Sequence, residues 1–277
     1  RDAQAAEVPV FLRFASEMNG SWVKWHGDPA LYIEKFRLIA IVMKEEAPNV
    51  AMVWSPAANP KAKIAEYYPG DNYVDWVGLS MYSVKFFNGD PNSPADGLNP
   101  LDSLDYVYKQ YSARKPIMVS EYGATHFSKA GNVSVPKFAV TKMNMLYHGA
   151  KLKYPRLKAI NWFSLNTLTD SHSAERSLNN FSLTENAAVL KAYGQMVANP
   201  YYLSEVVGGG ASEVGYERAV NKLASGTKLT RATTVYVWAK TYDPYIGKIV
   251  VKLDGKFAMS GTQYPYAVAI DPAKLAA

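Results

Sequence analysis

The stretch Val10-Phe11-Leu12-Arg13-Phe14-Ala15-Ser16-Glu17-Met18-Asn19-Gly20-Ser21-Trp22-Val23-Lys24-Trp25 begins apolar and ends polar. Its apolar part predicts a buried strand over residues 8–14, and small and polar residues then end the strand. In a barrel or open sheet of parallel strands, the loops at the carboxyl ends of the strands build the functional site. The sequence therefore predicts that Glu17 lies where a catalytic acid would be found. Position alone is also compatible with an ordinary surface Glu in a loop.

The same loop carries two tryptophans, Trp22 and Trp25. Neither belongs to a helical or strand period that would bury it, and ordinary loops avoid such large apolar faces. Aromatic faces of this kind suit stacking against sugar rings. The tryptophans therefore favour a functional interpretation of Glu17 over the surface one.

Composition excludes several classes of function. The chain has 277 residues, of which 48% are hydrophobic and 13% aromatic, and this suits one large or two medium globular domains. The net charge of +6 is spread along the chain, and no basic run indicates a nucleic-acid site. With no Cys, and with four His that show no metal-binding spacing, we predict neither a catalytic metal nor a cofactor. No apolar run approaches the ~20 residues of a membrane-spanning helix.

A strand and helix alternation continues from the opening stretch. The expected helices start at Asp28-Pro29, Leu101, Pro136 and Glu185, and the expected strands cover residues 8–14, 50–54, 74–82, 116–123 and 157–164. The side chains at or just after the strand ends are Glu17, Trp54, Tyr82, Glu121 and Trp162. Because parallel strands end on the same side of a sheet, these carboxylates and aromatic groups are predicted to gather there, as sugar cleavage requires.

Two motifs resemble those of glycoside hydrolase family 26. Glu17-Met18-Asn19-Gly20-Ser21-Trp22, with Arg13 upstream, resembles the acid/base signature, and the run Tyr67 to Tyr82 resembles a second signature. The resemblance covers roughly residues 8–198. It implies a (β/α)8 TIM barrel of glycosidase clan A and a retaining β-glycanase, most often an endo-β-1,4-mannanase. It also implies a bacterial enzyme that is secreted or at the cell surface, with a polysaccharide substrate and no cofactor.

The resemblance implies roles for individual residues. Glu17 corresponds to the acid/base, protonated at rest, and Glu121 to the nucleophile, ionised and hydrogen-bonded by Tyr82. Arg13 is expected to brace the carboxylates, and Trp162 to form the floor of the subsite at the cleavage point. The further substrate-binding candidates are Ser16, Asn19, Trp22, Trp25 and Trp54.

One departure from the family concerns Ser16. Mannanases of the family usually have a His immediately before the acid/base, and Ser is shorter and cannot be charged. The resemblance implies mannan or glucomannan as the substrate, and the departure at Ser16 keeps a β-1,3-1,4-glucan or a β-1,3-xylan as the alternative. A non-catalytic glycan- or cell-wall-binding protein is the alternative from another class. We favour an enzyme because Glu17, Glu121, Tyr82 and Trp162 are all present.

The sequence changes character near residue 199. Residues 1–198 form the predicted barrel domain, and residues 199–277 form a predicted all-β module. After Gly208-Gly209-Gly210, strands are expected at 233–239, 249–253 and 266–270, with a hairpin turn at Asp254-Gly255. The module most resembles an incomplete immunoglobulin-like domain. We expect a spacer rather than a carbohydrate-binding unit.

Only five of the eight strands of a (β/α)8 barrel are visible before the module. By the resemblance they are strands four to eight, so the first three βα units are missing. A five-stranded sheet would leave two open edges and an uncovered interior. We therefore expect that the chain is a fragment of a longer protein and that a second polypeptide supplies the missing strands.

Overall fold

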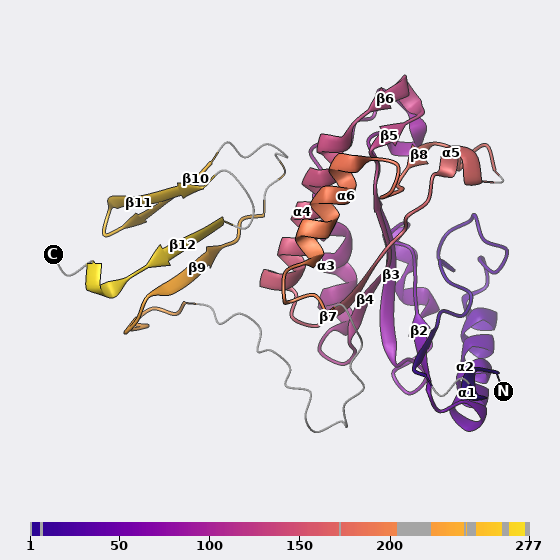
Figure 1. The fold of residues 1–277 in the computed structure, drawn as a ribbon. Coiled ribbons are helices and arrows are strands. Elements are labelled where there is room, and N and C mark those ends of the chain that lie inside the picture. Colours follow the sequence, from indigo (N-terminus) through magenta and orange to yellow (C-terminus); the bar gives the residue numbers. More distant parts are fainter. Residues whose placement is uncertain are drawn as a thin grey trace.

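The computed structural model describes residues 2–5, 8–171, 173–203, 223–240, 242, 248–261 and 266–274. Its centre is a five-stranded parallel sheet in the order β1-β2-β3-β4-β7 (Figure 1). The strands are β1 (Val10–Leu12), β2 (Val50–Trp54), β3 (Trp76–Ser83), β4 (Ile117–Ala124) and β7 (Leu157–Trp162). Neighbours in the sheet follow one another along the chain, which is the arrangement of a partial β/α barrel. The five predicted strands are confirmed, with β1 shorter than expected.

Helices follow four of the five parallel strands, β1, β3, β4 and β7, and pack against one face of the sheet. They are α2 (Pro29–Glu46), α3 (Pro100–Tyr111), α4 (Pro136–Lys153) and α6 (Ala187–Val197), and a short α1 (Asp2–Ala5) precedes β1. The sequence signal at Asp28 is confirmed, because its side chain accepts a hydrogen bond from Leu31 N and Pro29 occupies the first turn of α2. Asn99 and Asn186 cap α3 and α6 in the same way.

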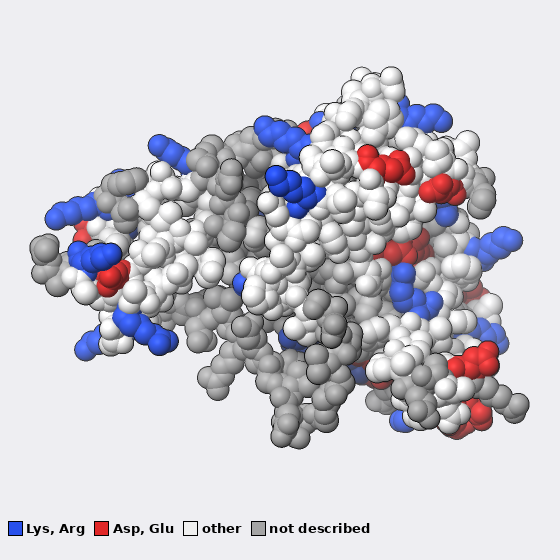
Figure 2. All heavy atoms as spheres, viewed as in Figure 1, with Lys and Arg blue, Asp and Glu red and all other residues white. Residues whose placement is uncertain are grey.

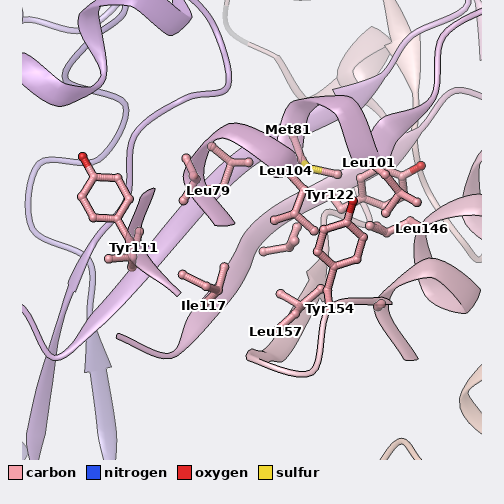
Figure 3. Packing of buried hydrophobic residues seen from close by; sticks show 14 of the residues in the cluster. Leu79, Met81, Leu101, Leu104, Tyr111, Ile117, Tyr122, Leu146, Tyr154 and Leu157 are labelled. Atoms are coloured by element: carbon pink, nitrogen blue, oxygen red, sulfur yellow. The ribbon is translucent and has the colours of Figure 1, made fainter. Parts of the chain in front are cut away.

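The hydrophobic core lies between the sheet and its helices (Figure 3). Leu79, Ile117 and Tyr122 point from β3 and β4 toward Leu104 of α3 and Leu146 of α4. All five side chains are buried. Burial of an aliphatic or aromatic side chain of this size contributes about 1.5–3 kcal/mol. This layer holds the strands in register and thereby fixes the positions of their carboxyl ends.

The opposite face of the central strands carries small residues. A Cβ added to Gly78 would lie 2.1 Å from Ser120 Oγ and 2.9 Å from Ser55 Cβ. Ser55 Oγ in turn donates to Ser120 Oγ at 3.0 Å. The strands can approach this closely only because Gly78 has no side chain.

The described residues 166–171 and 173–180, after β7, are structured. This segment contains α5 (Thr167–Asp170) and β8 (Asn179–Asn180), and β8 joins β5 (Phe127–Ser128) and β6 (Val133–Ser134) in a small antiparallel sheet. Asn179 also accepts a buried hydrogen bond from the Thr125 hydroxyl, at 3.0 Å. The C-terminal end of the segment is thereby fixed to the loop that follows β4.

The C-terminal part contains two antiparallel strand pairs. β9 (Thr233–Val237) pairs with β12 (Tyr266–Ile270), and β10 (Ile249–Leu253) pairs with β11 (Lys256–Gly261). The predicted hairpin turn is confirmed: Asp254 and Gly255 have φ values of 50° and 77°, which is the conformation that Asp-Gly turns favour. The predicted run Gly208-Gly209-Gly210 lies outside the described residues.

This all-β part contacts the helical layer. Lys240 forms ion pairs with Asp102 and Asp105 of α3, and Trp238 packs under the ammonium of Lys153 of α4 at 5.3 Å. Helices α3 and α4 accordingly lie between the parallel sheet and strands β9 and β12 (Figure 1). On the face shown in Figure 2, the basic side chains of the described residues are scattered among acidic ones. No described helix is both long and apolar enough to cross a membrane.

Candidate functional site

A register shift in β4 directs Glu121 away from the hydrophobic core. Leu79 of β3 pairs with Val119, but the next residue, Ser80, pairs with Glu121, so Ser120 is an extra residue in β4. Val119 and Tyr122 both lie in the core, although strict alternation would put residues three apart on opposite faces. The bulge at Ser120 therefore leaves Glu121 on the face opposite the helices, where bulges often re-aim a functional side chain.

Both carboxylate oxygens of Glu121 accept hydrogen bonds. Arg13 Nη1, just after β1, donates to Oε1 at 2.7 Å, while Arg13 Nη2 donates to Ser80 Oγ at 3.1 Å. The hydroxyl of Tyr82, at the end of β3, donates to Oε2. Burial, and then the negative charge of Glu121, raise the pKa of Tyr82, so this hydroxyl keeps its proton and remains a donor. Three strands thus contribute to the surroundings of one carboxylate.

Glu17 has a backbone conformation that is unusual for a residue other than Gly. Its φ is 62°, in the left-handed region. Glu17 N donates to Ser55 O at 2.8 Å, and Gly20 N donates to Glu17 O at 2.9 Å. These bonds tie the loop to the end of β2 and hold the strained residue in place. Such strain is common at functional sites, where the surrounding structure enforces it.

Trp22 lies directly against Glu17. Its indole Nε1 donates to Glu17 Oε2 at 2.7 Å, and its ring packs on Gly20, where an added Cβ would lie 2.4 Å from the ring. Trp25 Nε1 donates to Ser16 O at 2.8 Å. Trp22 and Trp25 each keep 46% of their surface exposed, so the predicted loop presents two fixed aromatic faces to solvent.

Trp162, at the end of β7, is partly buried beside the same strand ends. Its Nε1 donates to Phe181 O at 2.9 Å, and its ring packs edge-on against Tyr122 at 5.4 Å. Phe181 in turn contacts the ring of Tyr82 at 5.3 Å. Sequence reasoning missed Phe181, which lies in an irregular segment without a period. An added Cβ at Gly123 would lie only 2.8 Å from Phe181, so that glycine makes room for it.

Two predicted substrate-binding residues lie elsewhere, and those predictions are wrong. Trp54 is 0% exposed and packs between Tyr68 and Tyr111, with ring centroids at 4.9 and 5.3 Å. It points from β2 into the helical layer and contacts no solvent. Asn19 is 3% exposed, and its side chain both donates to Ala57 O and accepts from Ala57 N, each at 2.9 Å. Asn19 therefore fixes the loop and is not free for a ligand.

The contacts of Arg13 differ in part from those predicted. It was expected to brace both carboxylates, and the part of the chain that the structure describes contains its bond to Glu121 but none to Glu17. Ser16 is half-buried beside Glu17, and its carbonyl oxygen accepts the Trp25 bond. Within the described ranges, no three His, Asp or Glu side chains gather as metal ligands would.

Fold and site together define a class of protein: a partial β/α barrel with carboxylates at its strand ends beside exposed aromatic faces. Residues 1–93 match the family described as glycosyl hydrolase family 26. The match includes Glu17, Trp22 and Tyr82.

Individual relatives cover limited parts of the chain. A β-1,3-xylanase from Vibrio sp. is 36% identical over 87 residues, which are 30% of this chain and 18% of the relative. Mannan endo-1,4-β-mannosidase A and B from Caldalkalibacillus mannanilyticus is 28% identical over 160 residues, which are 54% of this chain and 26% of the relative. The chain thus spans about a quarter or less of the length of these two relatives.

A solved structure has the same fold. The modular endo-β-1,4-mannanase from Cellulomonas fimi superposes with a TM-score of 0.50 at 19% identity, covering 82% of this chain and 47% of that one. At this identity the likeness concerns the fold alone.

Proposed function

We propose that the chain carries the catalytic carboxylates of a retaining, endo-acting β-glycoside hydrolase. The observation that carries the proposal is the environment of Glu121, whose two oxygens accept from Arg13 and from Tyr82. A cationic donor and a neutral one both favour the ionised carboxylate. Glu121 is therefore prepared to act as the nucleophile that attacks the anomeric carbon.

Glu17 supplies the proton to the leaving oxygen. An indole N–H is a donor only, so Glu17 Oε2 must present a lone pair to Trp22, and the acidic proton is carried on Oε1. Trp22 therefore fixes which oxygen faces the glycosidic bond. After the glycosyl-enzyme forms, the ionised Glu17 serves as the base for the attacking water.

The sugar chain stacks on the aromatic groups around the carboxylates. Trp22 and Trp25 offer exposed faces, and Trp162 forms the floor at the cleavage point. Ser16 contributes to substrate binding and replaces the His that is usual in mannanases of the family. We propose β-1,4-mannan or glucomannan as the substrate, since the relatives include a mannan endo-1,4-β-mannosidase. The β-1,3-xylanase among them makes β-1,3-xylan the second substrate to test.

Residues 1–198 form the catalytic domain in this proposal, with β1, β2, β3, β4 and β7 as strands four to eight of a (β/α)8 barrel. In the described part of the chain, the outer edges of β1 and β7 have no further partner strand. An unpaired edge leaves backbone donors and acceptors open to pairing. We propose that a second polypeptide supplies three further βα units. Denaturing gels and intact-mass measurement of the active particle should then show two species, and a single active species of 30.6 kDa would contradict this.

Residues 199–277 form an immunoglobulin-like spacer in the proposal. Two antiparallel strand pairs and their docking on α3 and α4 support a separate β module. We propose that the protein acts outside a bacterial cell, because a polymeric glycan cannot enter it.

The test is release of reducing ends from mannan, glucomannan, lichenan and xylan by the purified protein, with Glu121→Ala as the control. We expect activity on one or more of these glycans and none with the variant. Binding of a glycan without release of reducing ends would instead favour the non-catalytic alternative.

A further inference from the structure

A hydrogen bond joins two loops from opposite edges of the sheet. β1 and β7 are the outer strands, and the loop that follows each contains one partner: Trp22 after β1 and Arg176 after β7. Arg176 Nη2 donates to Trp22 O at 3.2 Å across 154 residues of sequence. The bond therefore spans the end of the sheet where Glu17 and Glu121 lie.

The contact continues from Arg176 to a carboxylate. Trp22 accepts the Arg176 bond with its backbone carbonyl and donates from its indole to Glu17 Oε2 at 2.7 Å. The carbonyl carbon of Trp22 is bonded to the Cα that carries the indole side chain, so a movement of this carbonyl group also moves the ring. A restraint on this carbonyl is therefore also a restraint on the donor that faces Glu17.

The segment that carries Arg176 is itself held firmly. Ser177 N donates to Ser173 O at 3.1 Å, and the hydroxyl of Ser177 donates to Leu168 O of α5, also at 3.1 Å. Two residues on, Asn179 N donates to the Thr167 hydroxyl at 3.1 Å, and β8 begins there. Arg176 is thus an exposed side chain on an anchored turn, which can transmit a restraint to the loop it reaches.

We propose that Arg176 is a positioning residue for the general acid. Through Trp22 it holds the indole N–H on Glu17 Oε2 and so keeps the proton-bearing Oε1 aimed at the leaving oxygen. The inference rests on the proposed function of Glu17. Nothing in the opening stretch indicates it, because the partner lies in a different loop at the far edge of the sheet.

The chemistry gives the substitution a specific signature. A poor leaving group, such as a sugar hydroxyl, needs the proton from Glu17, whereas dinitrophenolate departs without it. The value of kcat/KM reports steps up to departure of the leaving group, so hydrolysis of the glycosyl-enzyme does not enter. Arg176→Ala should therefore lower kcat/KM on the glycan about ten-fold, against the 10²–10⁴-fold of a whole general acid, and change kcat/KM on a dinitrophenyl β-glycoside less than two-fold.

Two further variants complete the test. Arg176→Lys keeps a charged donor and should recover part of the loss. Glu175→Ala is the matched control: it changes an exposed neighbour that has no hydrogen bond or ion pair among the described residues, and it should leave all values unchanged.

An NMR measurement that does not depend on turnover separates the positioning role of Arg176 from the proposed glycosidase function. In ¹⁵N-Trp labelled protein, the indole N–H signal of Trp22, assigned with Trp22→Phe, should shift in Arg176→Ala and not in Glu175→Ala. Equal loss on both substrates, no loss, or an unmoved indole signal would overturn the role of Arg176. A wild-type protein inactive on both substrates, with the indole signal shifting as expected, would instead contradict the proposed glycosidase function.

Discussion

Tyr82 donates its hydroxyl hydrogen to Glu121 Oε2 from the neighbouring strand β3, while Arg13 donates to the other oxygen, Oε1. The ring of Tyr82 is held independently by Phe163 and Phe181, with centroids at 5.5 and 5.3 Å. The hydroxyl can therefore be removed without removing the ring's packing, and this makes Tyr82 a clean position for testing the site.

Tyr82→Phe should lower kcat/KM on the glycan by roughly 10–100-fold with little change in melting temperature. The variant loses one donor to the nucleophile, a hydrogen bond to a charged group worth about 1.5–3 kcal/mol. Steady-state kinetics and circular dichroism measure the two effects. Tyr68→Phe removes a hydroxyl that binds Asp71 instead, and it should leave kcat/KM unchanged. Equal losses in the two variants would mean that Tyr82 has no specific role.

Glu121→Ala should abolish turnover, and azide should restore part of it by forming a glycosyl azide of inverted configuration. Glu17→Ala should spare substrates with activated leaving groups, which need no acid. Product analysis by NMR checks the first outcome and kinetics with aryl glycosides the second. If Glu17→Ala lost activity equally on both kinds of substrate, it would not be the acid.

A crystal structure with a bound oligosaccharide should place the carboxyl groups of Glu17 and Glu121 roughly 5–5.5 Å apart. This spacing leaves no room for a water molecule between acid and nucleophile. A spacing of roughly 6.5–9.5 Å would indicate an inverting enzyme, and one beyond about 12 Å would exclude a shared reaction.

Gly78→Ala should be markedly destabilising. The new methyl group would overlap Ser120 Oγ, and relief of such overpacking typically costs about 1–3 kcal/mol. Gly194→Ala in α6 is the matched control, because an added Cβ there meets nothing within 4 Å and a helix favours Ala by about 0.5–1 kcal/mol. Denaturant unfolding should therefore show a lower free energy of unfolding for Gly78→Ala and a higher one for Gly194→Ala. Equal changes in the two variants would contradict the close strand contact.

Acid should weaken the fold through His148 of α4. Burial, and then the nearby Lys151, lower the pKa of His148 from 6.5 to about 4. Between these pH values the unfolded chain binds a proton at His148 that the folded chain does not. The contribution of neutral His148 to the free energy of unfolding is therefore complete above pH 6.5 and is lost as the pH falls toward 4. His148→Gln should make the free energy of unfolding less dependent on pH over this window. Parallel pH curves for wild type and His148→Gln would exclude the effect.

The sequence predicted the order of elements well because its signals were local. Asp28-Pro29 starts α2, Pro136 starts α4 and Asp254-Gly255 turns the hairpin, and each signal acts within a few residues. The opening stretch also led to Glu17, since a strand end fixes where a following side chain emerges. The strand ends at Tyr82 and Glu121 met as expected because parallel strands finish on one side.

The site predictions that were wrong depend on the direction in which a side chain points, and local sequence signals do not determine that direction. Trp54 ends a strand just as Tyr82 does, yet it points to the helices, and only the packing of Tyr68 and Tyr111 around it reveals this. Asn19 lies in the motif itself but satisfies the backbone of Ala57. The contact from Arg176 to Trp22 depends on two loops that are distant in sequence.

The additional residue at Ser120 uncouples the direction of the side chains before it from the direction of those after it, which a regular strand would link. In a strand of strict period two, a core position at Val119 would also fix the direction of Glu121 and Tyr122. Because Ser120 is an extra residue, Val119 and Tyr122 can both face the helices while Glu121 faces the open side of β4. Strict alternation through Ser120 would instead exchange the places of Glu121 and Tyr122, putting a carboxylate in the core and converting a reactive surface into an apolar one.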